Sequence, residues 1–207
     1  MATTQPRTVR KRLSILAAAR DLFLAHGYSG VSMDQVGALA QVSKVTVYAH
    51  FADKQSLFTA VMRAAIDEAE ATSRSLVDRL GVSSDLEGDL RNFARDHLNT
   101  VTQPHLIQLR RMIIAEAIRF PELARSWHRA APERAHATLA RQLHQLADRG
   151  LLTVPDPLLA AQTLNYLILS VLLNEAMFLG RDKPFSRRAI QRHADEAVRV
   201  FLAAYAA

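Results

Sequence analysis

Four polar side chains recur at every second position of one short stretch: Lys44, Thr46, Tyr48 and His50. They provide a cation, two hydroxyl groups and an imidazole, all of which can donate hydrogen bonds. No carboxylate occurs between Gln35 and Ala52. A surface of donors without acids suits close approach to a polyanion, and the phosphates of nucleic acid are such a partner.

A pair of short helices is expected to carry these side chains. Ser32 and Gln35 have the S-x-x-Q spacing of a capping box, so a first helix should begin there. Its apolar face would be formed by Val36, Leu39 and Ala40.

Ser43 is the N-cap candidate of the second helix, and Val47 and Phe51, four residues apart, can face one core. Asp53 can cap a third helix. Two helices of about two turns each, joined by a tight turn, form a helix-turn-helix. The alternative is an ordinary helical pair whose polar face is merely solvated.

A longer pattern surrounds this stretch. It reads Ile15-Leu16-x-x-Ala19-x-x-Leu22-Phe23-x-x-x-Gly27-Tyr28, then Val31-Ser32, then Gln41-Val42-Ser43-Lys44-Val45-Thr46-Val47-Tyr48-Ala49-His50-Phe51-x-x-Lys54-x-x-Leu57. Over roughly residues 8–60 the chain resembles the DNA-binding domain of the TetR family of bacterial transcriptional regulators. The resemblance implies a dimer with a DNA-binding domain at 1–54 and a helical ligand-binding and dimerisation domain at 55–207.

Carried over position by position, the resemblance implies two groups of DNA contacts. The first would touch bases or adjacent phosphates and comprises Lys44, Val45, Thr46 and Tyr48. The second would hold the DNA backbone and comprises Ser32, His50 and Lys54.

Three positions depart from the family pattern. Gln41 replaces a usual glycine in the turn, so a non-glycine residue is expected in a left-handed or bridge conformation. Val45 replaces a common glycine or similar small residue, and Ala49 replaces a common larger polar or aromatic residue, so both positions carry methyl groups. Specificity would therefore depend on thymine methyl groups and on DNA shape.

Composition and charge agree with a helical, nucleic-acid-binding chain. The 207 residues are 49% hydrophobic, with seven Gly and seven Pro, which favours helices and a sizeable core. The absence of cysteine excludes disulfides, thiolate nucleophiles and Cys-based zinc sites, and suits a reducing cytoplasm. The net charge is +6, of which +4 falls within residues 1–54.

The basic beginning of the chain is not followed by the apolar core of a secretory signal. An amphipathic pattern follows instead, formed by Ile15, Leu16, Ala19, Leu22 and Phe23. We interpret residues 1–6 as a loose tail and 7–12 as a basic arm that lies on phosphates or enters a minor groove. A solvated, disordered start is the alternative.

The rest of the chain also has helical periodicity, and we expect an all-α fold of nine to ten helices without a strand. The expected helices are 8–26, 55–80, 86–101, 105–119, a short one from 121, 132–150, 158–179 and 186–205. The stretches 105–132 and 150–161 resemble the C-terminal domain of an AefR-like subgroup of the TetR family.

The helix at 158–179 is apolar nearly all round and long enough to be mistaken for a membrane span. Polar residues interrupt it, namely Gln162, Asn165, Ser170, Asn174 and Glu175. We therefore expect no membrane segment, and interpret one face as core and the other as contact with a second subunit. Together with the helix at 186–205 it would form a symmetric four-helix interface. A monomer with a wholly internal helix is the alternative.

The C-terminal part also contains candidate residues for a small-molecule pocket. The candidates lie on helices expected to line the interior of the C-terminal domain: Met112, Glu116, Phe120, Trp127, Asn165, Tyr166, Leu169 and Phe178. Plain core packing is the competing role for each. Glu116 and Asn165 are the most informative, because a buried polar group needs a partner.

Catalytic and metal-binding signatures are missing. His128, His136 and His144 are spaced by eight, which is not the i, i+4 pairing of a helical zinc site. The chain has no G-x-S-x-G, no Walker glycine loop, no dinucleotide fingerprint and no H-E-x-x-H. We expect no catalytic site, metal or cofactor.

These observations lead to one hypothesis, a dimeric cytoplasmic repressor released from a palindromic DNA operator by a small-molecule effector. A DNA-binding scaffold or an activator without a ligand response is the alternative, and an enzyme is a third class that no motif supports.

Overall fold

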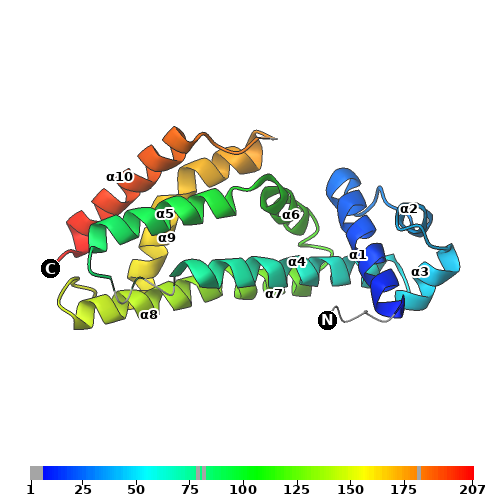
Figure 1. The fold of residues 1–207 in the computed structure, drawn as a ribbon, viewed down its shortest axis with the longest axis horizontal. Coiled ribbons are helices and arrows are strands. Elements are labelled where there is room, and N and C mark those ends of the chain that lie inside the picture. Colours follow the sequence, from blue (N-terminus) through cyan, green and yellow to red (C-terminus); the bar gives the residue numbers. More distant parts are fainter. Residues whose placement is uncertain (1–6, 78–79, 81–82, 181–182) are drawn as a thin grey trace, which may run out of the picture. The chain divides into compact units, whose positions relative to one another are not determined.

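Helices make up most of the part of the chain that the computed structural model describes, which is residues 7–77, 80, 83–180 and 183–207. In these ranges the α-helices are α1 (Arg7–His26), α2 (Met33–Leu39), α3 (Lys44–His50), α4 (Lys54–Val77), α5 (Leu86–Val101), α6 (Pro104–Ala115), α7 (Pro121–His128), α8 (Arg134–Asp148), α9 (Pro157–Phe178) and α10 (Arg187–Tyr205) (Figure 1). The same ranges contain one isolated bridge, Leu152–Ala206, and no longer strand. The all-α prediction is confirmed.

The helices form two compact units. The first contains the described residues up to Ile66 together with Leu109–Arg125, and the second contains Asp67–Gln108 and Ser126–Ala207. Helices α4, α6 and α7 therefore contribute residues to both units. The boundary between functional domains at residue 54 stays a prediction, because compactness does not identify the residues that bind DNA or a ligand.

An aromatic cluster forms part of the core of the first unit. The ring of Phe58 from α4 lies 5.1 Å from that of Phe23 and 5.0 Å from that of Tyr28, both edge-on. Phe120 joins the cluster, with its ring centroid 5.2 Å from Tyr28 and 5.2 Å from Phe58. Such edge-to-face pairs add to the stabilisation from burial. The cluster fixes α1, which ends at Gly27 with a φ of +69°, against α4.

The turn between α2 and α3 sets the angle of the second short helix. Gln41 has a φ of +55°, so the expected left-handed conformation of a non-glycine residue is confirmed. The Gln41 N–H donates to the Ala38 carbonyl (3.2 Å), and the Val42 N–H donates to the Gly37 carbonyl (3.0 Å). A Cβ atom on Gly37 would lie 3.1 Å from the Val42 oxygen, so a glycine at this position lets the turn approach α2 closely.

The second unit has α5, α8, α9 and α10 around one core, and Figure 1 shows α10 running along α5. Two polar contacts join its helices across the core. The Arg95 Nη2 of α5 lies 2.6 Å from the Asp195 Oδ1 of α10, and the His97 Nε2 of α5 lies 2.9 Å from the Asn165 Oδ1 of α9. These contacts fix the positions of α9 and α10 along α5.

Helix α9 is buried on one face and exposed on the other. Its buried face includes Leu164, Ile168 and Leu172, whereas the exposed face carries Leu158, Leu159, Tyr166, Val171 and Phe178. In the described ranges α9 is the one helix that is long and apolar enough to span a membrane, and 39% of an apolar 18-residue stretch within it is buried. A core helix of a protein outside the membrane can have the same length and composition.

Two expected elements differ from the structure. Helix α6 ends at Ala115 rather than at 119, and residues 116–119 form turns before Pro121. Pro132 was expected to begin a helix, but it lies inside a π-helical segment, Arg129–Glu133, between α7 and α8. A proline has no N–H for the α-helical ladder, and a wider π turn accommodates the missing bond. The expected fading of the fourth helix falls partly at 78–79 and 81–82, outside the described residues.

Substitutions at Gln41 test the strain in the turn. Glycine adopts positive φ freely, whereas a β-branched side chain does not. We expect Gln41→Val to destabilise the folded chain by about 1–2 kcal/mol, and Gln41→Gly to keep or raise the melting temperature, both measured by thermal unfolding followed by circular dichroism. Equal losses in both variants would show that the glutamine side chain, rather than the backbone angle, stabilises the turn.

Candidate nucleic-acid interface

The capping box predicted at Ser32 begins α2. The Ser32 N–H donates to Gln35 Oε1 (2.8 Å), and the Gln35 N–H donates to Ser32 Oγ (3.3 Å). Both side chains are exposed. Ser32 therefore lies at an open helix end, where a hydroxyl group can reach a DNA phosphate.

Burial of one face fixes the rotation of α3. Val47 is fully buried, and Phe51, the C-cap residue, is 5% exposed. Because successive residues of a helix are turned by about 100°, the other side of α3 must face solvent. Val45 is 78% exposed and Tyr48 is 45% exposed. The helix thus presents a methyl-bearing side chain and a phenol outward.

The start of α3 is organised by Ser43. Its Oγ accepts a hydrogen bond from the Thr46 N–H (3.2 Å) and lies 2.9 Å from Thr46 Oγ1. The N-cap predicted from the sequence is confirmed. The half-buried Thr46 hydroxyl group is consequently oriented by the cap, with hydrogen-bonding capacity left for a second partner.

Lys44, the cation at the start of α3, is paired with an acid on α2. The Lys44 Nζ lies 2.8 Å from Asp34 Oδ1 and 3.0 Å from Asp34 Oδ2. The hydrogen bond that Lys44 donates to Asp34, followed by the attraction of the Asp34 charge, raises the pKa of Lys44 above its ordinary value. Sequence reasoning missed this pair, because a separation of ten residues across a turn has no periodic signal.

Lys54 is engaged within the first unit. Its Nζ donates to the Val31 carbonyl (2.7 Å) and lies 4.6 Å from the centre of the Tyr28 ring. A longer contact of 3.5 Å reaches the Ser29 carbonyl. The ammonium group therefore holds the segment before α2, in addition to its predicted contact with the DNA backbone.

The C-terminal end of α3 lies beside the basic part of α1. The half-buried His50 has its ring centroid 6.5 Å from that of Phe51. The guanidinium carbon of Arg12 lies 4.9 Å from the centre of the Phe51 ring, a cation–π contact. The predicted basic arm at 7–12 is therefore the first part of α1, and residues 1–6 lie outside the described residues.

The eight predicted ligand residues are divided between the units. Met112, Glu116 and Phe120 belong to the first unit, where Phe120 is part of the aromatic cluster with Tyr28 and Phe58. The second unit contains the other five, which are Trp127, Asn165, Tyr166, Leu169 and Phe178. No common pocket is assigned to the eight.

In the second unit, three of the five are buried and two are not. Trp127, Leu169 and Asn165 are buried, and the Asn165 Oδ1 accepts a hydrogen bond from the His97 Nε2. Tyr166 and Phe178 lie on the expected helix, α9, but their side chains are 60% and 83% exposed, so their role in ligand binding stays a prediction. A helix that is apolar all round does not reveal from its sequence which face is inward.

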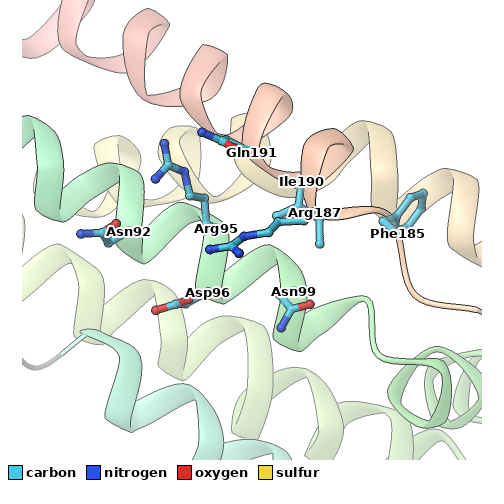
Figure 2. A pocket seen from close by; sticks show the side chains of 8 residues that line it. All are labelled: Asn92, Arg95, Asp96, Asn99, Phe185, Arg187, Ile190 and Gln191. Carbon is cyan, nitrogen blue, oxygen red and sulfur yellow. The ribbon is translucent and has the colours of Figure 1, made fainter.

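A concave region that the sequence did not indicate lies between α5 and α10. Its volume is about 470 Å³, and Figure 2 shows the lining side chains, which are Asn92, Arg95, Asp96, Asn99, Phe185, Arg187, Ile190 and Gln191. Phe185 and Ile190 are buried, whereas most of the polar groups are exposed. None of the eight predicted ligand residues lines this groove.

Substitution of Lys54 separates its internal role from a DNA contact. Lys54→Met keeps the aliphatic stem but removes the donor to the Val31 carbonyl, which should cost about 1–3 kcal/mol of stability without any DNA present. Lys54→Arg, which retains a cationic donor, should lose less. A melting temperature unchanged in Lys54→Met would mean that the contacts with the Ser29–Val31 segment contribute nothing.

Comparison with known proteins identifies the family to which this chain is similar. A family model for bacterial regulatory proteins of the tetR family matches residues 15–61, and a model for the C-terminal domain of AefR-like transcriptional repressors matches residues 88–207. The HTH-type transcriptional regulator RutR of Escherichia coli (strain K12) is 39% identical over 57 residues, which cover 28% of this chain and 27% of RutR. The match to this curated relative thus spans about a quarter of its length.

Solved structures match over nearly the whole chain. A TetR-family transcriptional regulator from Mesorhizobium loti MAFF303099 is 37% identical, with a TM-score of 0.89 and coverage of 98% of this chain and 100% of that one. The flavonoid-responsive regulator FrrA is 31% identical, with a TM-score of 0.75 and coverage of 96% and 98%. The model for residues 88–207 alone spans more than half of the chain. The chain, with its N-terminal helix-turn-helix and its helical C-terminal part, therefore belongs to the TetR family of bacterial DNA-binding transcriptional regulators.

Proposed function

We propose that the chain is a homodimeric repressor that places α3 of each subunit in the major groove of a palindromic operator and is released by a small-molecule effector. The observation that carries this proposal is the orientation of α3. Its Val47 side is fixed in the core, while Val45 and Tyr48 are exposed on the other side. A recognition helix needs such a rigid, outward-facing row of side chains.

Each predicted DNA residue has a role that its geometry supports. Lys44, Val45, Thr46 and Tyr48 would contact bases or the nearest phosphates, because they occupy the first turns of α3. The exposed Val45 suits the methyl group of thymine. Ser32, His50 and Lys54 would hold the DNA backbone on either side.

The dimer is supported by the exposed apolar face of α9. Leu158, Leu159, Val171 and Phe178 are large apolar side chains left in contact with solvent in one subunit. Large apolar side chains exposed along one helix favour an interaction site. A two-fold arrangement would cover the face with its own copy, with α10 alongside, and would present two α3 helices to two half-sites.

An effector would act through the helical C-terminal part. The buried contact between His97 and Asn165 is a polar pair within an apolar core, and small-molecule pockets combine mostly apolar walls with a few polar groups. We propose Asn165 as the polar anchor of an effector site, with the buried Leu169, one turn further along α9, and the buried Trp127 as apolar walls. The name of FrrA describes a flavonoid-responsive protein, and an aromatic, hydroxylated effector is a sensible first probe.

Release would follow from linkage between the two ligands. The DNA-binding domains of the two subunits must hold their α3 helices about 34–36 Å apart to meet successive major grooves on one side of B-DNA. An effector that prefers a conformation with another spacing lowers operator affinity by its differential affinity for the two conformations. Helix α4 contributes residues to both units, so we propose that the change passes along it. We propose that the protein acts in the bacterial cytoplasm, because operator DNA lies there.

Selection of bound duplexes from a random pool tests the proposal. We expect an inverted repeat, and a screen of compounds against the recovered duplex should then identify one that releases the protein. Recovery of a preferred duplex without any releasing compound would favour the scaffold or activator alternative. Recovery of no preferred sequence would contradict operator recognition.

Substitutions in α3 test the assigned contacts. Lys44→Ala removes a cation and Tyr48→Phe removes one hydroxyl group, so each should weaken binding to the selected duplex, by about 5- to 10-fold or more if the group contacts a base edge. The dimer should be unchanged in sedimentation experiments, because both side chains are exposed. Wild-type affinity in both variants would rule out these contacts.

Substitution of Asn165 tests the effector site. Asn165→Ala should raise the effector concentration needed for half-release at least fivefold, with little change in operator affinity without effector. Asn99→Ala, which truncates an amide in the groove of Figure 2, is the matched control and should respond as the wild type does. If Asn99→Ala weakened the response to the effector and Asn165→Ala did not, the effector site would instead lie in the groove between α5 and α10.

A further inference from the structure

The contact between Lys44 and Asp34 is an unusual feature of the candidate interface. Asp34 is the one acidic residue in the sequence from Ser32 to Ala52. Both of its carboxylate oxygens lie within 3.0 Å of the Lys44 Nζ. The side chains remain 58% (Lys44) and 63% (Asp34) exposed, so water and DNA can reach both.

The pair neutralises the first cation of α3 before any DNA arrives. A lysine free to meet a phosphate releases a counterion and steepens the salt dependence of binding. Lys44 gives up that contribution for as long as it stays with Asp34. The carboxylate also carries a negative charge close to the surface that must approach the phosphates.

The strengths of the competing contacts decide when the pair breaks. An exposed ion pair changes an equilibrium constant by about fivefold or less. One additional phosphate contact on non-operator DNA changes the binding constant by a similar factor. Exchanging the Asp34–Lys44 ion pair for such a contact therefore changes the affinity little. A correctly placed base-edge contact is worth about 5- to 150-fold in discrimination, which exceeds the loss of the pair.

We propose that Asp34 is a specificity-determining residue, which masks the Lys44 ammonium group on non-operator DNA and releases it where the operator offers a base edge. The inference rests on the proposed function of α3 as the recognition helix. Asp34 would keep non-specific affinity low while costing little at the operator. It touches no DNA itself in this account and acts through Lys44.

The competing role for Asp34 is that of a support which orients Lys44 towards the DNA. Supporting residues are themselves held by further hydrogen bonds. Lys44 is the one side-chain partner of Asp34 in the described part of the chain. The exposed carboxylate is therefore free to lose its partner, which favours masking over support.

The experiment uses the full chain and two duplexes. One is the duplex recovered by selection, and the other has the same length and base composition in scrambled order. Binding of the wild type, Asp34→Asn, Lys44→Ala and the double variant is measured by fluorescence anisotropy over a series of salt concentrations. Asp21→Asn is the matched control, because Asp21 is an exposed acid on α1, beside Arg20, and is not one of the predicted contact residues.

Masking predicts an unequal response of the two duplexes. Asp34→Asn should raise affinity for the scrambled duplex by about three- to fivefold, with a salt slope steeper by about 0.9. The selected duplex should gain less, so the ratio of the two affinities falls. In the Lys44→Ala background, the gain on the scrambled duplex should shrink to that of Asp21→Asn. Asp34→Ser, another uncharged variant of the first turn of α2, should behave as Asp34→Asn does.

Three results would overturn masking. The first is an equal gain in affinity of Asp34→Asn for both duplexes, and the second is a gain that persists in full in the Lys44→Ala background. The third is weaker binding of Asp34→Asn to the selected duplex, which would make Asp34 a support for Lys44. Failure of the proposed function is distinguishable from these. In that case selection recovers no preferred duplex, or Lys44→Ala leaves both affinities unchanged, and masking fails with it.

Discussion

The burial of Val47 is the constraint on which the candidate interface depends. A seven-residue helix has little stability of its own, so its orientation comes from tertiary packing. Val47 and the following Phe51 fix one side of α3 in the core of the first unit. The opposite side is then directed to solvent, whatever its residues are. This explains how Val45 can be strongly exposed in an ordered helix without a hydrophobic partner in the same subunit.

Local chemistry was readable from the sequence wherever the partners are close in the chain. The capping box of Ser32 and Gln35 and the N-cap at Ser43 follow from spacings of a few residues, and the structure has both. The positive φ of Gln41 was expected from the family resemblance, and the structure has it as well. The all-α fold followed from helical periodicity for the same reason. Family resemblance added the assignment of those elements to a DNA-binding head.

Contacts between distant residues were not readable. Asp34 and Lys44 are ten residues apart, and Lys54 reaches a carbonyl 23 residues earlier, so neither pairing has a periodic signal. The inward face of α9 was equally hidden, since an apolar residue at every turn gives no preferred side, and Tyr166 and Phe178 are exposed. The prediction of ligand-binding residues is affected most, because a pocket depends on the direction of side chains rather than on composition.

The interface therefore combines a rigid backbone with charges that are already paired. Val47 fixes the direction of α3, Ser43 fixes Thr46, and Lys54 holds the segment before α2, so these groups need little reordering to meet DNA. Lys44 must exchange its Asp34 partner for a group of the DNA. Such an arrangement favours discrimination through contacts that form only on the right sequence over affinity from unpaired positive charge.

Hydroxyl-radical footprinting of the full chain on its selected duplex tests the central claim most directly. Two α3 helices presented by a symmetric pair should protect two patches of backbone about one helical turn apart on the same side of the duplex, related by the dyad of the sequence. A single protected patch, or two patches on opposite sides of the duplex, would contradict the claim that α3 is presented twice to successive major grooves.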